Sequence, residues 1–362
     1  MSSRSPDDNL DNKPGDNPKQ AQALQGRYDR QVRVRGFGAE GQKRLGKARV
    51  GIVGCGALGS RVAEDLARAG VGYLRLMDRD FVEIGNLHRQ YLFDEQAALA
   101  EEPKVLAAAR RLAEINSQVE VSPELCDLGP ANAEELLLDL DLWIDGTDNF
   151  QTRYLLNDLA VRESRNWIYG ACVGTQSMSA AFLAGRACLR CLFPDPPPAG
   201  STETCETAGI LPPAAGFTSA IQSGLALQIL AHPESPPESG LITADLTSFE
   251  IRRMKLPSQS LAHCVACGER SFPALSMDQA AQARALCGRN AIQLSAPAAG
   301  FPELEVLAER IGDAIELERH AYLLRLKIPE GRITVFRDGR AIIEGTEDAG
   351  RARALFDRYL GT

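Results

Sequence analysis

The chain has 362 residues, 44% of them hydrophobic, and a formal net charge of −8 at pH 7, which allows a large core in roughly two or three domains. The negative charge argues against nucleic-acid binding, which needs a concentrated basic face. No apolar run approaches the roughly 20 residues that cross a bilayer, and no signal-peptide pattern opens the chain. We therefore expect a cytoplasmic protein that binds neither nucleic acid nor a membrane.

The first 270 residues predict a tail followed by an α/β domain. Residues 1–25 are rich in Asp, Asn, Pro and Gln, so we expect them to be disordered. From residue 49 to about residue 148, apolar strand-like runs alternate with helical patterns, which predicts a parallel sheet with helices on its faces. Further strands are expected within residues 167–193, a long apolar helix over 218–231, and a strand pair in "LITADL" and "FEIRRMKL". A mixed sheet accommodates all of them.

The remaining residues predict a small α+β module. One helical face runs from Leu304 to Ile311, and "RITVFRDGRAIIEG" is typical of a hairpin that turns at Asp338–Gly339. A closing helix is expected between Ala352 and Leu360. We find no chemical motif in this module. The expected domains are therefore residues 26–270 and 271–362.

A glycine-rich turn lies in "RVGIVGCGALGSRVAEDLARAG", between a predicted strand and a predicted helix. Gly54, Gly56 and Gly59 let the backbone approach a phosphate, and the first N–H groups of the helix can donate to it. Nicotinamide, flavin and ATP sites share this pattern. The turn therefore predicts phosphate binding without identifying the nucleotide.

Nine cysteines in an apparently cytosolic chain do not suggest a disulfide framework. Cys188 with Cys191, and Cys264 with Cys267, form two C-x-x-C pairs, which together favour a closed structural zinc site. The alternatives to a zinc site are a redox-active disulfide within one pair and a chance occurrence of the two pairs.

The other cysteines divide into two groups. Cys205 lies in a polar loop rich in Pro, Gly and Thr, where it could be a nucleophile or an exposed cysteine without function. The remaining four are interpreted as packing residues: Cys55, Cys126, Cys172 and Cys287.

Polar residues gather after the second predicted strand and at the end of the fourth. Asp78 could hold ribose hydroxyls in a dehydrogenase or in an ATP-using enzyme. Arginine and lysine residues gather near the phosphate-binding loop, and a carboxylate is available there for Mg²⁺. This combination indicates a site that clamps a triphosphate, and a dehydrogenase would not need it. Each residue alone could be a solvated surface charge. The clamp residues are Asn86, Arg89, Gln90, Lys104 and Asp148.

Residues 27–268 resemble the ThiF/MoeB/HesA group of adenylyltransferases, bacterial relatives of the ubiquitin-activating enzymes. The resemblance rests on "RYDRQVRV", "GCGALGS", "DRDFVEIGNLHRQ", "DGTDNFQTRYLLND", "CLRCLFPDPPP", "TCETAGIL" and "CVAC". It implies a Rossmann-like mixed sheet and a homodimer that uses Mg-ATP. The reaction it implies adenylylates the C-terminal glycine of a ubiquitin-like sulfur carrier ending in Gly-Gly, with release of pyrophosphate.

The resemblance also implies a role for each matching residue. Arg30 would reach the ATP site of the partner subunit, and Asp148 would bind Mg²⁺ and help to place the carboxylate. Cys205 would form a thioester or acyl disulfide with the carrier. The remaining matches would hold ATP through its phosphates and ribose: Gly54, Gly56, Gly59, Asp78, Asn86, Arg89, Gln90 and Lys104.

Two features depart from the family pattern. Lys104 arrives in "EEPK", where the family has a glycine and a basic or polar residue before Pro-Lys. The module after residue 270 is not the sulfurtransferase domain of longer relatives, and Cys287 is a weak candidate for sulfur transfer.

The alternatives are an NAD-dependent oxidoreductase and a non-catalytic regulatory relative. The segment "GSTETCETAGIL" resembles the thiazole branch more than the molybdopterin branch.

Overall fold

The computed structural model describes residues 26–197, 207–276, 284–286, 290–294, 301–312, 315–320, 322–337 and 339–361. The chain divides into two compact units, Met1–Ser276 and Met277–Thr362. The tail of residues 1–25 lies outside the described residues, as do Cys205, Cys287 and Asp338. Each unit is described by itself below.

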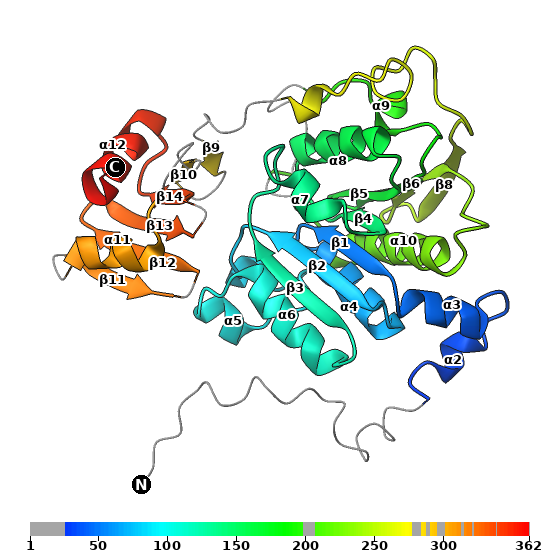
Figure 1. The fold of residues 1–362 in the computed structure, drawn as a ribbon, viewed down its shortest axis with the longest axis horizontal. Helices are drawn as coiled ribbons and strands as arrows, with labels where there is room; N and C mark the ends of the chain where they lie inside the picture. Colours follow the sequence, from blue (N-terminus) through cyan, green and yellow to red (C-terminus); the bar gives the residue numbers. More distant parts are fainter. Residues whose placement is uncertain are drawn as a thin grey trace, which may run out of the picture. The chain divides into compact units, whose positions relative to one another are not determined.

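The first unit is built on one eight-stranded mixed sheet in the order β3-β2-β1-β4-β5-β6-β7-β8 (Figure 1). The strands from β3 to β5 are parallel, and β6, β7 and β8 are added antiparallel. The expected Rossmann-like mixed sheet is thereby confirmed. Its strands are β1 Arg49–Val53, β2 Tyr73–Asp78, β3 Glu120–Leu125, β4 Leu142–Asp145, β5 Trp167–Val173, β6 Gln176–Phe182, β7 Gly240–Asp245 and β8 Glu250–Lys255.

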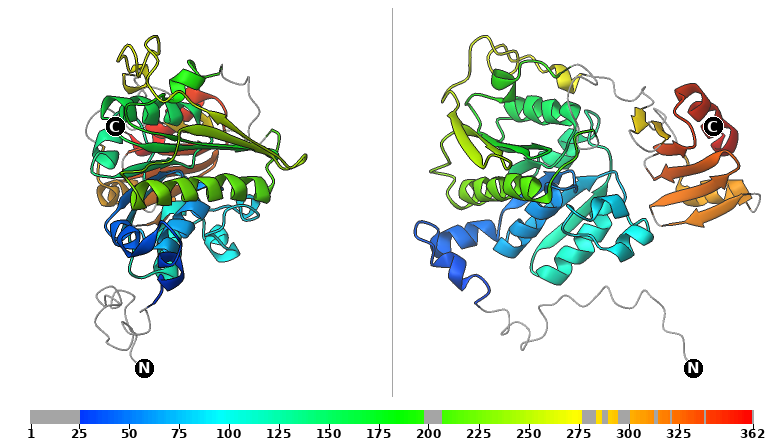
Figure 2. Two further views of the ribbon diagram at one scale, coloured as in Figure 1. Left: turned by 90° about the vertical axis from the view of Figure 1, so that its right-hand side faces the viewer. Right: turned by 180° about the vertical axis from the view of Figure 1, so that it is seen from behind.

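Helices cover both faces of this sheet, as Figures 1 and 2 show. Because successive strand side chains point to opposite faces, Leu142 and Ile144 of β4 belong to one hydrophobic core, and Trp143 belongs to the other. One core includes residues of α4 (Gly59–Ala69), α6 (Lys104–Ile115) and α10 (Pro212–Ala231), and the other those of α7 (Ala133–Leu137) and α8 (Phe150–Arg162). The shorter helical segments are α2 Asp29–Val32, α3 Gly38–Leu45, η1 Ile84–Asn86, α5 Glu95–Leu99, α9 Leu189–Leu192 and η2 Pro273–Leu275.

The helix α10 corrects one expectation. It has 20 residues and is long and apolar enough to cross a membrane by length and composition alone, whereas the sequence analysis found no such run. It also begins at Pro212, earlier than the expected residue 218, because proline is tolerated in the first helical turn. Half of its apolar window is buried, and it packs against α4, β5 and β6. These contacts make it a core helix of the first unit.

The second unit is a small α+β module, as expected. Its antiparallel sheet has six strands in the order β11-β12-β13-β14-β10-β9. The helices α11 (Leu304–Ile311) and α12 (Ala349–Leu360) contribute apolar residues to the same core as these strands. The strands are β9 Arg284–Leu286, β10 Ala291–Leu294, β11 Glu316–Arg319, β12 Leu323–Ile328, β13 Gly331–Phe336 and β14 Ala341–Glu344.

Candidate active site and metal centre

The loops that follow β1 and β4 meet at the point where the strand order reverses. From β1 the chain continues through β2 and β3 on one side of the sheet, and then returns to β4 on the other side. In open α/β sheets, ligands bind in the crevice outside the carboxyl ends of such strands. The Gly146 N–H donates to the carbonyl of Val53 at 2.8 Å, which ties the two loops together.

The three glycines of the first loop are required for different reasons. A Cβ at Gly59 would overlap the carbonyl oxygen of Gly54. Gly54 has a φ of +88°, and its Cβ would lie 3.0 Å from the backbone of Gly146. A Cβ at Gly56 would meet only the amide nitrogen of Gln90, at 3.9 Å. Gly54 and Gly59 therefore allow close packing of the loop, whereas Gly56 leaves open space of the kind a phosphate can fill.

Beside this open space lies a buried amide with an unused oxygen. Gln90 is only 4% exposed, and its Oε1 has no hydrogen-bond partner among the described residues. Because a buried polar atom without a partner costs free energy, a polar ligand next to Gly56 would remove that cost. Gln90 is thus placed where the sequence analysis expected a nucleotide-binding residue.

Asp78 holds the glycine loop against the end of β2. Its carboxylate accepts the backbone N–H of Cys55 at 2.6 Å and that of Asp80 at 2.8 Å. Burial raises the pKa of the Asp78 carboxyl, and the nearby Lys104 ammonium opposes that rise. Two backbone donors leave acceptor capacity on the carboxylate, so this anchoring role is compatible with contact to a ribose.

Lys104 reaches the same region although it follows the unusual "EEPK" segment. Its backbone N–H donates to the carbonyl of Asp80 at 2.9 Å, and its Nζ lies 3.1 Å from Asp80 Oδ2. The side chain is buried at the first residue of α6. The segment is thus fastened to the residues that follow β2, and a cation lies beside the glycine loop.

Asn86 lies one turn before Gln90, and Arg89 immediately precedes Gln90. The Arg89 guanidinium donates to Asn86 Oδ1 at 2.8 Å and to the carbonyl of Gly85 at 3.1 Å. Asn86 in turn donates to Glu83 at 3.1 Å. A third contact joins Arg89 to His88 Nε2 at 3.4 Å, and within the described residues no carboxylate is paired with the charge of Arg89. Such a cation can neutralise an anionic ligand.

The two aspartates of the loop after β4 have opposite surroundings. Asp145 is fully buried and accepts both the N–H and the hydroxyl of Thr147, at 2.9 and 2.7 Å. Its other oxygen lies 3.0 Å from Nε of Arg153 on α8. Asp148 is exposed, and its carboxylate can offer the oxygen ligands that Mg²⁺ prefers. Sequence reasoning singled out Asp148 and missed the pair of Asp145 and Arg153, although both lie in "DGTDNFQTR".

Contacts join the glycine loop to most of the predicted nucleotide residues. Asp78 reaches it through Cys55, Lys104 through Asp80 and Asp78, and Gln90 lies next to Gly56; Asn86 and Arg89 lie beside Gln90. Within the described chain, no contact joins Asp148 or Arg30 to this group. Both side chains are exposed, Asp148 in the loop after β4 and Arg30 on α2.

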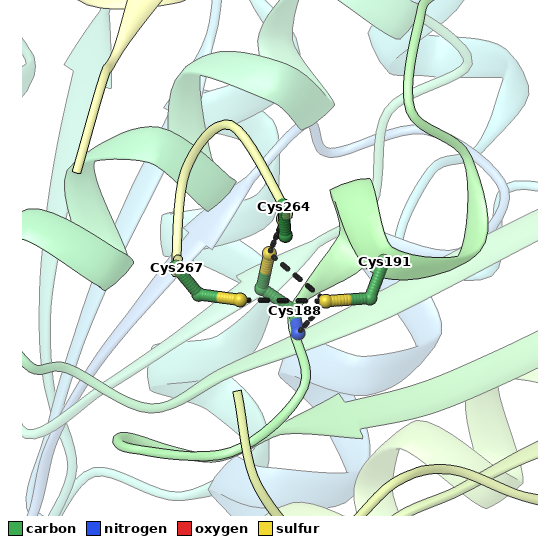
Figure 3. Close-up of side chains that lie close together, drawn as sticks. All are labelled: Cys188, Cys191, Cys264 and Cys267. Carbon is green, nitrogen blue, oxygen red and sulfur yellow. Dashed lines mark hydrogen bonds between the residues drawn. The ribbon is translucent and has the colours of Figure 1, made fainter. Parts of the chain in front are cut away.

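The four paired cysteines converge on one point (Figure 3). Their sulfur atoms all lie within 4.8 Å of one another, and the three closest pairs are separated by 3.4, 3.7 and 4.0 Å. Four thiolates at about 2.3 Å from a tetrahedral zinc would be separated by about 3.8 Å. Cys188, Cys191, Cys264 and Cys267 are free thiols rather than disulfides, and burial raises the pKa of Cys191 to about 11. The donor set therefore fits a closed tetrahedral metal site.

A buried ion pair supports this cluster from α8. Asp158 is fully buried and accepts two hydrogen bonds from Arg190, at 2.7 and 2.9 Å. The neighbouring Asn157 accepts the N–H of Leu189 at 2.8 Å. Because Arg190 and Leu189 lie between the first two cysteines, α8 fixes the first C-x-x-C pair.

The other cysteines that the structure describes lie in or beside the hydrophobic cores. Cys55 and Cys172 are buried, and Cys126 is half-buried. Burial is the largest cause of the raised pKa of Cys55, followed by the charge of Asp78, so this thiol is a poor nucleophile.

Comparisons with known proteins agree with this geometry. The ThiF family model matches residues 28–266. The Bacillus subtilis sulfur carrier protein ThiS adenylyltransferase is 39% identical over 345 residues, covering 93% of this chain and 100% of that protein. The Sus scrofa adenylyltransferase and sulfurtransferase MOCS3 is 39% identical over 245 residues, covering 67% of this chain. This chain spans only 53% of the length of MOCS3.

The fold comparison gives the same architecture. A crystal structure of E. coli MccB with MccA-N7isoASN matches with a TM-score of 0.59 and 23% identity, covering 67% of this chain and 74% of that chain. At this identity the likeness concerns the fold alone.

Proposed function

The chain belongs to the ThiF family, and on this premise we propose that it adenylylates a ubiquitin-like sulfur carrier protein. In this reaction an oxygen of the carrier's C-terminal carboxylate attacks the α-phosphorus of ATP. The bond from that phosphorus to the bridging oxygen of the β-phosphate breaks, and pyrophosphate leaves with the electron pair. The relatives named for this activity support the assignment.

The observation that carries the proposal is the convergence at the strand-order reversal. The open space at Gly56, the unused amide oxygen of Gln90 and the cations of Arg89 and Lys104 meet there. Two anions must approach each other when a carboxylate attacks a phosphate, so the site has to supply positive charge. A hydride-transfer reaction has no comparable need, which favours the adenylyltransferase over the oxidoreductase.

Asp148 is the residue we propose for Mg²⁺. Bound Mg²⁺ would neutralise charge on the phosphates. The exposed Asp148 carboxylate differs from Asp145, whose oxygens are already occupied by Thr147 and Arg153.

The finer assignments are also proposals. We propose zinc as the ion of the four-cysteine cluster, on the basis of its donor set and geometry. We also propose a homodimer, in which Arg30 would reach the ATP site of the partner subunit. The free thiols fit a cytoplasmic location, which we propose as well. The match to the ThiS adenylyltransferase covers 93% of this chain, so it includes most of the second unit. For this reason we propose a carrier of the thiazole pathway rather than a carrier of the molybdopterin pathway.

Cys205 lies outside the described residues, and its role rests on the sequence. We propose that its sulfur attacks the carbonyl carbon of the carrier adenylate and displaces AMP, which gives a thioester from the thiol, or an acyl disulfide if a sulfur donor has first converted the thiol to a persulfide. Cys205→Ser should then retain nucleotidyl transfer and lose any covalent adduct with the carrier. An adduct that still forms in this variant would place the nucleophile elsewhere.

The function is tested by mixing the protein with Mg-ATP and a ThiS-like carrier, and by measuring the intact mass of the carrier. Wild-type protein should add one AMP to the carrier. Asp148→Asn should slow this reaction by about 100-fold or more, whereas Glu120→Gln, an exposed carboxylate change on β3, should not. A carrier that gains no AMP with wild-type protein would refute the proposed function.

A further inference from the structure

A second polar cavity lies beside the cysteine cluster. It has a volume of about 90 Å³. Its lining comes from the end of α8, the first residue of β5, the loop after β6 and the segment that carries the second cysteine pair. Three arginines line it, Arg165, Arg186 and Arg270, together with Cys188 and Cys267 of the cluster, and its lining contains no carboxylate. The strong positive charge of this cavity has no part in the reaction described above.

One wall of the cavity is formed by a tryptophan whose N–H is unused. Trp167 is 1% exposed, and its Nε1 has no hydrogen-bond partner among the described residues. The other tryptophan of the chain, Trp143, donates its Nε1–H to the carbonyl of Leu137 at 2.8 Å. Buried tryptophans normally donate their N–H to an acceptor. We therefore expect the Trp167 N–H to donate to a bound molecule in the cavity.

The arginines have only neutral partners within the described residues. Arg165 donates to the carbonyl of Leu138 at 2.8 Å, and one nitrogen of Arg186 lies 3.5 Å from the carbonyl of Pro237. Arg270 donates to two backbone carbonyls at the end of α8. A guanidinium has five N–H groups, so Arg165 and Arg186 retain donors for a further partner.

The two buried arginines that the structure describes in this unit have carboxylate partners: Arg153 pairs with Asp145, and Arg190 pairs with Asp158. Arg165 and Arg186 are half-buried and Arg270 is exposed. A metal held by four thiolates carries a net charge of −2 if the ion is divalent, which offsets part of the charge at the cavity. No sulfur of the described cluster accepts the Trp167 N–H.

We propose that this cavity binds one small oxyanion with the chemistry of phosphate or sulfate. Its oxygens would accept the Trp167 N–H and N–H groups of Arg165 and Arg186. The small volume of about 90 Å³ suits a four-oxygen anion. The anion would connect β5 and the loop after β6, and so stabilise the surroundings of the cysteine cluster.

Thermal unfolding of the full-length, metal-loaded protein tests this site. We would titrate inorganic phosphate against chloride at constant ionic strength and follow Tm. An anion that binds only the folded state raises Tm, and above its dissociation constant the stabilisation grows with the logarithm of its concentration. Trp167→Phe removes the N–H, and Arg186→Gln removes one charge on a half-buried side chain. Each should weaken the apparent phosphate affinity at least tenfold.

Two variants serve as controls. Arg89→Gln removes a cation of the proposed nucleotide site, and Arg252→Gln changes an exposed arginine of β8; both should retain the full phosphate-dependent rise in Tm. Metal content and AMP transfer to the carrier should be unchanged in Arg186→Gln, which separates this proposal from the proposed function.

Three results would overturn the proposal. One is a Tm that rises equally with phosphate in the wild-type protein and in all variants, which is a general salt effect. Another is a phosphate-dependent rise that is lost only in Arg89→Gln, which would place the anion in the proposed nucleotide site. The third is a dependence of Tm on phosphate in Arg186→Gln that equals that of the wild-type protein. This result would refute the proposed anion site even if Trp167→Phe does not fold.

Discussion

At the scale of single residues, the loop after β4 separates a structural carboxylate from a proposed catalytic one. Asp145 and Arg153 form a buried pair that fixes the loop from α8, and Gln222 donates to the Asp145 carbonyl at 2.7 Å. Asp148, three residues later, is exposed. A single motif therefore contains both the support of the site and a group that can touch its ligand.

Arg153→Gln tests the structural half of this distinction. It leaves the Asp145 carboxylate buried without its ionic partner, so we expect a loss of about 3–5 kcal/mol in the free energy of unfolding, measured with urea. Asp148→Asn is the matched variant and should change that free energy by no more than about 0.5 kcal/mol. Equal effects of the two changes would contradict this assignment.

The glycine loop allows a second pair of variants. Gly59→Ala places a methyl group on the Gly54 carbonyl, so the protein should be strongly destabilised or fail to fold. Gly56→Ala places a methyl group in open space, so the protein should keep its Tm within a few degrees while its KM for ATP rises. A normal KM for ATP in Gly56→Ala would show that this space is not used by the nucleotide.

At the scale of elements, α8 connects the two centres of the first unit. Arg153 on this helix holds the loop after β4, and Asp158, between one and two turns later, holds Arg190 beside the cysteines. The helix is buried along most of its length. A metal bound by the four cysteines would therefore stabilise the helix that supports the proposed nucleotide site, without offering an open coordination position for chemistry.

The metal centre gives a prediction on this scale. The purified protein should contain one zinc per chain, and Cys191→Ser should lose most of it, with a Tm lower by roughly 5 °C or more. Cys126→Ser, a half-buried cysteine away from the cluster, should keep the zinc. Metal analysis that finds no zinc in wild-type protein, or the same content in Cys191→Ser, would refute the assignment.

At the scale of the whole molecule, the architecture could be predicted because its signals are local. Largely apolar runs such as "YLRLMD" coincide with β2, since a parallel strand covered on both faces is mostly apolar; the two charged residues of β2, Arg75 and Asp78, are its only partly exposed positions. The glycine turn and the paired cysteines were recognisable by spacing alone. The small second unit, with its hairpin of β13 and β14, followed from alternating apolar residues.

The features that escaped prediction depend on distant partners. Nothing local in the sequence pairs Asp158 with Arg190, 32 residues apart, or directs Gln222 toward the loop after β4. The length of α10 was underestimated because its first turn contains prolines and its buried face contains polar residues, including Ser219 and Gln222. Such residues obscure the apolar pattern on which the prediction relied.

The central claim is that this chain activates a carrier's carboxylate with ATP. Carrier-dependent exchange of labelled pyrophosphate into ATP tests it most directly, because only reversible adenylylation returns the label to ATP. We predict exchange with wild-type protein when an intact ThiS-like carrier is present, and none with a carrier that lacks its terminal glycine. Exchange that is absent with the intact carrier, or that proceeds equally without any carrier, would contradict the account.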